Sequence, residues 1–238
     1  MILFTTSNSK RPAIRAAIVD LDGTMLDTVP DFHVAINRMR EAFELAPLGQ
    51  DQIAGMVGKG SEHLIRGVLA LDFDNPAVAA RLDQAMALYQ QNYLAINGNH
   101  STLYPGVIEG LEAMKSQGLR LACVTNKPLA FAAPLLAQKG LAPYFDLLYG
   151  GDSFARKKPD PMPLLQVCTD FALRPDEVVA IGDSSNDAEA ARAAGCFVLT
   201  VPYGYNHGRP IHETDSDGIV DTLLEAAMKV RSHNATAN

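Results

Sequence analysis

The feature that most constrains this chain is a short apolar run that stops abruptly at a pair of aspartates. Ala16-Ala17-Ile18-Val19 is followed directly by Asp20-Leu21-Asp22-Gly23-Thr24. A short run that is apolar at every position and closed by a polar turn is typical of a strand buried on both faces. We therefore predict a strand here, with Asp20 and Asp22 lying just beyond its end.

The same pattern recurs in the second half of the chain. After residues 97–99, helical and strand segments alternate, which is the order expected of a parallel sheet covered by helices. We predict a doubly wound α/β core with five parallel strands. Besides the first strand, strands are expected at 119–125, 146–149, 178–181 and 197–201, and helices at 105–118, 129–138 and 221–230.

Residues 31–97 contain no strand pattern and are predicted to be helical. Ser61 can cap a second helix of this segment, and Pro76 can open a third. The first helix has one apolar stripe, formed by Phe32, Ile36, Met39 and Phe43. The predicted domains are an inserted all-helical cap domain over 30–98 and an α/β core domain made of 1–29 and 99–238.

Composition narrows the classes of function. Of the 238 residues, 47% are hydrophobic and 20% are charged, which excludes a largely disordered chain. The net charge of −7 argues against a broad nucleic-acid-binding surface, so an anionic ligand needs a local cationic pocket. No apolar run approaches the roughly 18 residues of a membrane span, and residues 1–15 lack an apolar stretch of signal-peptide length. We expect a cytoplasmic monomer or homodimer that binds neither membranes nor nucleic acid, with residues 1–13 forming a loose tail or the start of a strand.

The cysteines and histidines show no metal-binding spacing. Three cysteines, an odd number, are widely spaced in apolar segments, so neither a disulfide framework nor a CxxC metal site is expected. We predict that Cys123, Cys168 and Cys196 are small core residues.

Polar side chains follow the predicted strands at the edge where ligands bind in an open parallel sheet. Thr125-Asn126 follows the second strand, and the basic run Arg156-Lys157-Lys158 follows the third. Carboxylates gathered at one place repel each other unless a cation lies among them. Mg2+ fits best, because it combines few carboxylates with waters and a substrate phosphate. The carboxylates after the first and fourth strands are Asp20, Asp22, Asp183 and Asp187.

Four segments in this order resemble the motifs of the haloacid dehalogenase superfamily, and the resemblance spans residues 16 to about 225. They are Asp20-Leu21-Asp22-Gly23-Thr24-Met25-Leu26-Asp27, Thr125-Asn126, Lys158-Pro159-Asp160-Pro161 and Gly182-Asp183-Ser184-Ser185-Asn186-Asp187. The helical insert resembles the cap of the phosphoglycolate phosphatases in that superfamily. Further local matches to those enzymes are Thr125-Asn126-Lys127-Pro128 and Tyr203-Gly204-Tyr205-Asn206.

The resemblance implies a phosphatase that forms an aspartyl-phosphate. Asp20 would be the nucleophile and Asp22 the general acid and base. Lys158 would neutralise charge on the phosphoryl oxygens. The implied substrate-binding residues are Thr125, the backbone of Asn126, Gly23 and Lys59, and the implied Mg2+ ligands are Asp20, Asp183 and the carbonyl of Asp22. Asp187 would orient a metal-bound water or Lys158.

Several residues keep a structural alternative. Lys157 could replace Lys158, and Lys59, between Gly58 and Gly60, either reaches a substrate carboxylate or lies in an ordinary turn. Asp27 is expected to be a helix cap or hinge residue. Asn186 could cap a helix with Glu189 completing a capping box, and the segment 203–209 borders the site or forms a surface loop.

We expect a Mg2+-dependent phosphatase of a small phosphomonoester, with 2-phosphoglycolate converted to glycolate and phosphate. The alternatives are a phosphatase or phosphomutase acting on a sugar phosphate or nucleotide, and a binding protein that has kept the fold and lost turnover. A dehalogenase is disfavoured, because cleaving a carbon–halogen bond requires neither the acid at Asp22 nor the metal.

Overall fold

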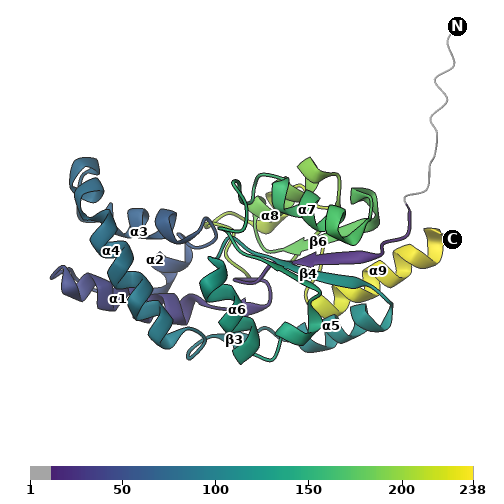
Figure 1. Ribbon diagram of the computed structural model, residues 1–238, viewed down its shortest axis with the longest axis horizontal. Helices are drawn as coiled ribbons and strands as arrows, with labels where there is room; N and C mark the ends of the chain where they lie inside the picture. The colour runs from purple at the N-terminus through teal and green to yellow at the C-terminus, as the bar shows by residue number, and fades with distance from the viewer. Residues whose placement is uncertain (1–11, 238) are drawn as a thin grey trace, which may run out of the picture.

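The core of the molecule is a six-stranded sheet in the order β5-β4-β1-β6-β7-β8, with every neighbouring pair parallel (Figure 1). The computed structural model describes residues 12–237, so most of the tail expected at 1–13 lies outside the described residues. The strands are β1 (Ala16–Val19), β4 (Arg120–Val124), β5 (Leu147–Tyr149), β6 (Val178–Gly182), β7 (Phe197–Thr200) and β8 (Gly218–Ile219). The doubly wound α/β fold is confirmed, with β8 as an additional edge strand of two residues.

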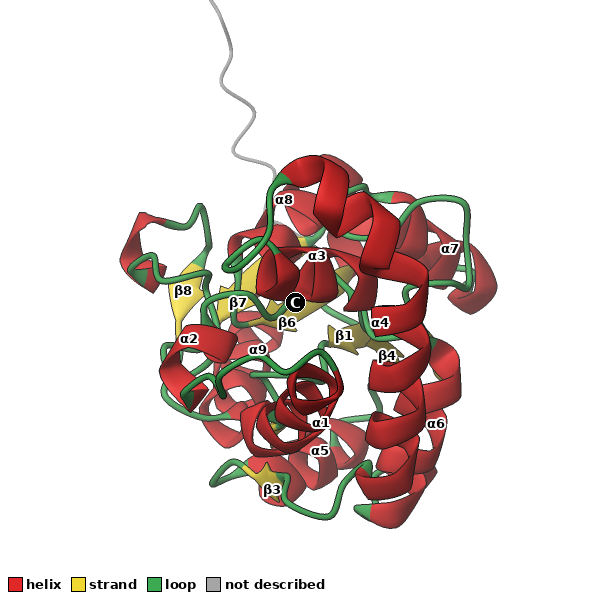
Figure 2. Cartoon of the chain, turned by 90° about the vertical axis from the view of Figure 1, so that its left-hand side faces the viewer, coloured by secondary structure: helices red, strands yellow, loops and turns green. Residues whose placement is uncertain are grey.

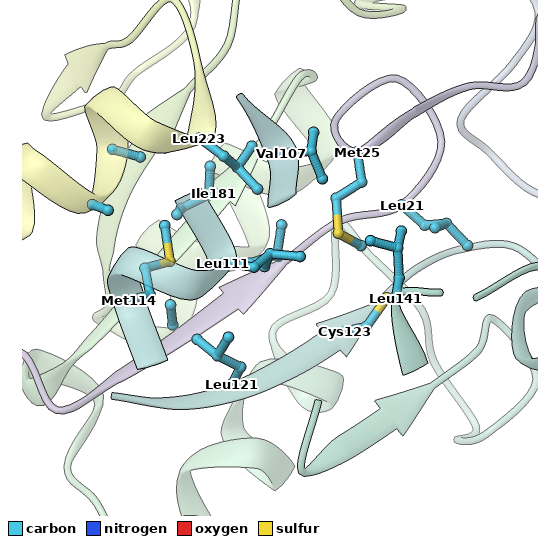
Figure 3. Packing of buried hydrophobic residues seen from close by; sticks show 14 of the residues in the cluster. Leu21, Met25, Val107, Leu111, Met114, Leu121, Cys123, Leu141, Ile181 and Leu223 are labelled. Atoms are coloured by element: carbon cyan, nitrogen blue, oxygen red, sulfur yellow. The ribbon is translucent and has the colours of Figure 1, made fainter. Parts of the chain in front are cut away.

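Both faces of the sheet are covered, which explains why β1 and β6, the two middle strands, carry no polar side chain. Ala17 and Val19 of β1 pack in one hydrophobic cluster, and Ala16 and Ile18 pack in another on the opposite face. The first cluster, seen in Figure 3, includes α5 (Val107–Ser116), α6 (Leu129–Gln138) and α9 (Leu223–Ala237). The second includes α7 (Met162–Phe171) and α8 (Ser185–Ala194). Short 3-10 helices lie at Ala142–Tyr144, Pro175–Glu177 and Ile211–Glu213.

The cysteines are part of these clusters, as the sequence predicts. Cys123 packs in the first cluster, and Cys168 and Cys196 pack in the second. All three are free thiols and buried.

Helices α1 (Val29–Ala42), α2 (Gln50–Ala54), α3 (Ser61–Leu69) and α4 (Asn75–Ile96) lie together beyond one end of the sheet (Figures 1 and 2). They share their own hydrophobic cluster, which contains Phe32, Ile36 and Met39. We call these helices and their loops the cap. Pro76 lies in the first turn of α4 as predicted, whereas the capping role expected for Ser61 is wrong: Gly60, at φ +86°, occupies the N-cap position of α3. The predicted domain boundaries at 30 and 98 stay a prediction.

The entry and exit of the cap are tied to each other. A small antiparallel sheet pairs β2 (Leu26–Asp27) with β3 (Thr102–Leu103). The buried Asp31 carboxylate accepts hydrogen bonds of 2.8 Å from the backbone N–H groups of Gly98 and His100. These contacts hold both ends of the cap near the sheet.

The strand order places the candidate site. The chain runs from β1 to β4 and β5 on one side, and then crosses to β6, β7 and β8 on the other. Val19 is in register with Cys123 of β4 and with Ile181 of β6. The loops after β1, β4 and β6 therefore leave the sheet side by side, at the point where the strand order reverses. Among residues 12–237, no helix has the length and hydropathy required to cross a bilayer.

Candidate active site

Three carboxylates meet at this edge of the sheet. Asp20 follows β1, Asp183 follows β6, and Asp187 lies in the first turn of α8; each offers an oxygen within 4.8 Å of the others. Burial raises the pKa of Asp20 well above its usual value, although the charge of Lys158 offsets part of the effect. Burial and the charge of Asp187 raise the pKa of Asp183 to about 7. Burial is the largest cause in both cases, so these surroundings favour the neutral form of both carboxyl groups.

Lys158 is the ammonium group of the cluster. Its Nζ lies 3.0 Å from Oδ1 of Asp20 and 2.6 Å from Oδ1 of Asp187, and it donates a hydrogen bond of 2.7 Å to the Val124 carbonyl. Burial opposes the charge on Lys158, but the two carboxylates outweigh it and hold the pKa of this lysine above its ordinary value. Lys157 is exposed, so the geometry places Lys158, and not Lys157, against Asp20.

The acidic cluster fits a divalent cation. Its three carboxylates face one ammonium group, and their oxygens are the donors that Mg2+ prefers. A cation among these carboxylates would lower the raised pKa values of Asp20 and Asp183, because it would favour their charged forms. The carboxylate of Asp22 lies outside this group, which leaves only its backbone carbonyl for the metal-binding role expected of it.

Asp183 is held by two hydrogen bonds and packs closely against two glycines. Thr24 Oγ1 donates a hydrogen bond of 2.9 Å to one oxygen of Asp183, and the Tyr205 backbone N–H donates to the other. A Cβ on Gly23, whose φ is +82°, or on Gly204 would lie 2.3 Å from the Asp183 side chain. Glycine is needed at both positions for steric reasons. The structure thus places Gly23, an expected substrate contact, against a carboxylate of the acidic cluster.

The helix start at Asp187 differs from the expected one. Ser184 is the N-cap residue of α8. Its backbone N–H (3.2 Å) and its hydroxyl (2.6 Å) both donate hydrogen bonds to Asp187 Oδ2. The capping box predicted for Asn186 and Glu189 is therefore wrong by two residues in register. Asp187 completes the capping box through Oδ2 and binds Lys158 through Oδ1.

A small cavity opens between the cap and the core, with about 30 Å3 available to the centres of water molecules. The side chain of Asn126 bridges the two parts: its Nδ2 donates to the Gly58 carbonyl in the cap (3.0 Å) and to the Lys158 carbonyl in the core (2.9 Å). Lys59 is exposed, and its neighbours Gly58 and Gly60 form part of the cavity wall. The complete lining is Asp20, Asp22, Phe32, Val57, Gly58, Gly60, Ser61, Leu64, Thr125, Asn126 and Lys127.

Sequence reasoning assigned no role to Lys127. Its Nζ lies 2.9 Å and 3.1 Å from the two carboxylate oxygens of Asp22, and its side chain is 2% exposed. The ammonium also lies 4.5 Å from the ring centroid of Phe32 and 4.8 Å from that of Tyr93, both in the cap. The signal available in the sequence was a lysine directly after Thr125-Asn126 at a strand end.

The segment 203–209 borders the acidic cluster. Besides the contact of its backbone with Asp183, Tyr205 donates its hydroxyl hydrogen to Asp27 and accepts hydrogen bonds from the backbone N–H groups of Thr28 (2.9 Å) and Val29 (3.2 Å). Asp27 also accepts a hydrogen bond of 3.3 Å from the Val29 N–H. The segment therefore joins the acidic cluster to the first residues of the cap.

Comparison with known proteins matches residues 14–195 to the haloacid dehalogenase-like hydrolase family. The phosphoglycolate phosphatase of Nitrosospira multiformis is 47% identical over 92% of this chain and 96% of its own length. The phosphoglycolate phosphatase of Thiobacillus denitrificans is 46% identical over 91% of this chain and 96% of its own length. Among solved structures, a predicted phosphoglycolate phosphatase from Haemophilus somnus superposes with a TM-score of 0.86 at 31% identity, covering 92% of this chain and 98% of that one.

Proposed function

This chain belongs to the haloacid dehalogenase-like hydrolases, and we propose that it is a Mg2+-dependent phosphatase that converts 2-phosphoglycolate to glycolate and phosphate. The family resemblance inferred from the four sequence motifs is confirmed. The observation that carries the proposal is that Asp20 and Asp22 line a small cavity under a helical cap, with Lys158 Nζ 3.0 Å from Asp20. High identity to proteins named phosphoglycolate phosphatase over nearly the whole chain supports the substrate.

The reaction takes two steps on Asp20. First, an oxygen of Asp20 attacks phosphorus and the ester P–O bond breaks, while Asp22 gives its proton to the departing glycolate oxygen. A water molecule then attacks phosphorus as Asp22 takes its proton. The aspartyl–phosphorus bond breaks, and Asp20 is regenerated with phosphate released. One water is consumed, and Asp22 ends the cycle protonated as it began.

The surrounding residues supply charge and orientation. Lys158, held by Asp187, faces the attacking carboxylate and would neutralise charge on the phosphoryl oxygens. Thr125 and the backbone of Asn126, at the end of β4, would donate hydrogen bonds to those oxygens. Asp20, Asp183 and the Asp22 carbonyl would hold Mg2+, which would supply positive charge to stabilise the phosphoryl oxygens.

The size of the cavity favours a small leaving group. Space of about 30 Å3 for water centres holds one or two waters, so the cap must move to admit any phosphomonoester, and it must move least for the smallest leaving group. Cap residues Val57, Gly58 and Leu64 form part of the wall, so the cap excludes water from the reacting atoms. We therefore favour 2-phosphoglycolate over the sugar phosphates and nucleotides that are the alternative substrates.

The test is phosphate release from 2-phosphoglycolate, ethyl phosphate, glucose 6-phosphate and AMP, each with Mg2+ and with EDTA. We expect 2-phosphoglycolate to give the highest kcat/KM, and EDTA or Asp20→Asn to reduce turnover by at least about 10³-fold. Asp74→Asn is the matched control, because asparagine can also cap α4, where Asp74 accepts the Ala77 N–H at 3.0 Å. Preference for glucose 6-phosphate or AMP would overturn the substrate. Near-normal activity of Asp20→Asn would overturn the nucleophile, and no turnover of any ester would favour a binding protein.

We also propose a cytoplasmic monomer or homodimer that does not bind nucleic acid. The net charge of −7 supports weak affinity for a polyanion. Size-exclusion chromatography coupled to light scattering measures the oligomeric state, and a mass above two chains would contradict this part of the proposal.

A further inference from the structure

We propose that Lys127 selects the substrate by binding the carboxylate of the substrate, while the adjacent Asp22 protonates the ester oxygen. The inference rests on the proposed function and deepens it, because it names the residue that distinguishes 2-phosphoglycolate from a phosphomonoester without a carboxylate. The geometry behind it is a buried ammonium group in the wall of the cavity that also exposes Asp20 and Asp22.

A charged group in this position is costly to the fold. The Lys127 side chain is 2% exposed, and burying an ammonium group removes its hydration. In this structure its partners are the Asp22 carboxylate and the faces of Phe32 and Tyr93, and the first of these charges is lost when Asp22 carries the proton it gives to the leaving group. An apolar side chain would fill the same space without that desolvation cost. The charge is therefore best explained by a ligand that needs it.

The hydrogen bonds of Lys127 leave room for such a ligand. An ammonium group has three N–H donors. Within residues 12–237, the hydrogen bonds of Lys127 Nζ go to the two oxygens of Asp22, which leaves one donor available. Because Lys127 lines the cavity, an anion inside it can accept that hydrogen bond.

The spacing of the two groups matches the proposed substrate. Asp22 must reach the ester oxygen to protonate it, and Lys127 Nζ lies 2.9 Å from the Asp22 carboxylate. In 2-phosphoglycolate, a single CH2 separates the ester oxygen from the carboxylate. A substrate whose ester oxygen contacts Asp22 therefore brings its carboxylate next to Nζ of Lys127.

Lys59 is the rival cation for the same carboxylate. It lies in the loop between α2 and α3, and its side chain is exposed. An ion pair in water contributes little, whereas a buried one discriminates strongly against a ligand without the charge. The burial of Lys127 is the reason for preferring it.

The experiment compares kcat/KM for 2-phosphoglycolate and for ethyl phosphate, which has a methyl group in place of the carboxylate. Variants are Lys127→Met, Lys127→Gln and Lys59→Met, with Lys115→Met as a control at a half-exposed lysine that lies 3.5 Å from Asp146 on the core. We expect the preference for 2-phosphoglycolate to fall by about 10²-fold or more in both Lys127 variants. In the Lys115→Met control, this preference should change by less than about threefold, which is the usual size of a surface effect. Inhibition of ethyl phosphate hydrolysis by glycolate should weaken in parallel.

The outcomes separate the two proposals. If kcat/KM falls by the same factor for both substrates in the Lys127 variants, Lys127 only positions Asp22. The inference is then wrong, while the proposed function stands. A loss of preference in Lys59→Met with none at Lys127 also overturns it. A wild-type enzyme that does not prefer 2-phosphoglycolate overturns both. Lys127→Gln keeps a hydrogen-bond donor toward Asp22 and provides the test if the methionine variant does not fold.

Discussion

Lys158 and Asp187 form a buried ion pair with a nitrogen–oxygen distance of 2.6 Å, joining the loop before α7 to the first turn of α8, 29 positions further along the chain. The same ammonium lies 3.0 Å from Asp20. Asp187 thus holds Lys158 in a position where its charge also acts on the candidate nucleophile. Because Asp187 also completes the capping box of α8, the position of this lysine depends on the start of that helix.

Asp187→Asn is expected to lower both stability and turnover. Removing one partner of a buried ion pair leaves the other charge poorly compensated, which costs about 3 kcal/mol of unfolding free energy. Loss of the Lys158 orientation should reduce kcat by about 10²-fold. Urea unfolding and phosphate release measure the two effects. The control is Glu62→Gln, which removes an exposed pair with Arg66 and should cost less than about 1 kcal/mol. Equal effects of the two variants would contradict the role of Asp187.

Gly204→Ala is expected to weaken metal binding. The added Cβ would lie 2.3 Å from the Asp183 side chain and 2.4 Å from the Gly23 carbonyl oxygen, so Asp183 must move. Displacing a metal ligand typically lowers affinity by about 10-fold to 100-fold, and we expect the Mg2+ concentration for half-maximal activity to rise accordingly. The matched control is Gly55→Ala, whose Cβ has its nearest neighbours at 3.8 Å. An unchanged Mg2+ titration in Gly204→Ala would show that Asp183 does not bind the metal.

Tyr205→Phe is expected to loosen the entry to the cap. The hydroxyl of Tyr205 accepts hydrogen bonds from the backbone N–H groups of Thr28 and Val29; its removal takes this acceptor from Thr28 and leaves Val29 with only its longer bond to Asp27. The expected loss is about 1–3 kcal/mol of unfolding free energy by urea denaturation. Tyr144→Phe, which removes an exposed hydrogen bond to Glu112, should stay within about 0.5 kcal/mol. If both variants unfold alike, Tyr205 does not tie the cap to the core.

His207 is expected to make stability depend on pH. Burial and the charge of Lys59 lower the pKa of His207 from its usual 6.5. The unfolded chain then binds the proton more readily than the folded one, so stability is lost as pH falls through about 6.5. The ring lies 3.1 Å from Asn186 Nδ2, and a protonated Nε2 cannot accept that hydrogen bond. The loss of Tm between pH 7.5 and pH 5.5 (about two pH units around the histidine midpoint) should be smaller in His207→Gln. Parallel Tm curves would exclude His207 as the source.

Local patterns predicted most of the fold because they depend on neighbouring residues. The apolar run 16–19 indicates burial on both faces, and alternate residues of β1 do pack in two clusters. The sequence missed α2 and β8, which have five and two residues. Elements this short do not complete enough periods of a helix or strand to be recognised. It also missed α7, which starts at Met162 directly after Pro161.

The sequence by itself determined which loops build the candidate site. Parallel strands place their carboxyl ends on one edge, so Asp20, Thr125 and Asp183 had to converge once the strands were recognised. Only the tertiary structure decided which charges face each other. Lys127 and Asp22 are 105 residues apart, and their contact depends on the pairing of β1 with β4 and on the cap rings above them. A charge in the sequence has no partner until the chain is packed, and the partner determines whether a lysine is a solvated surface group or part of a binding site.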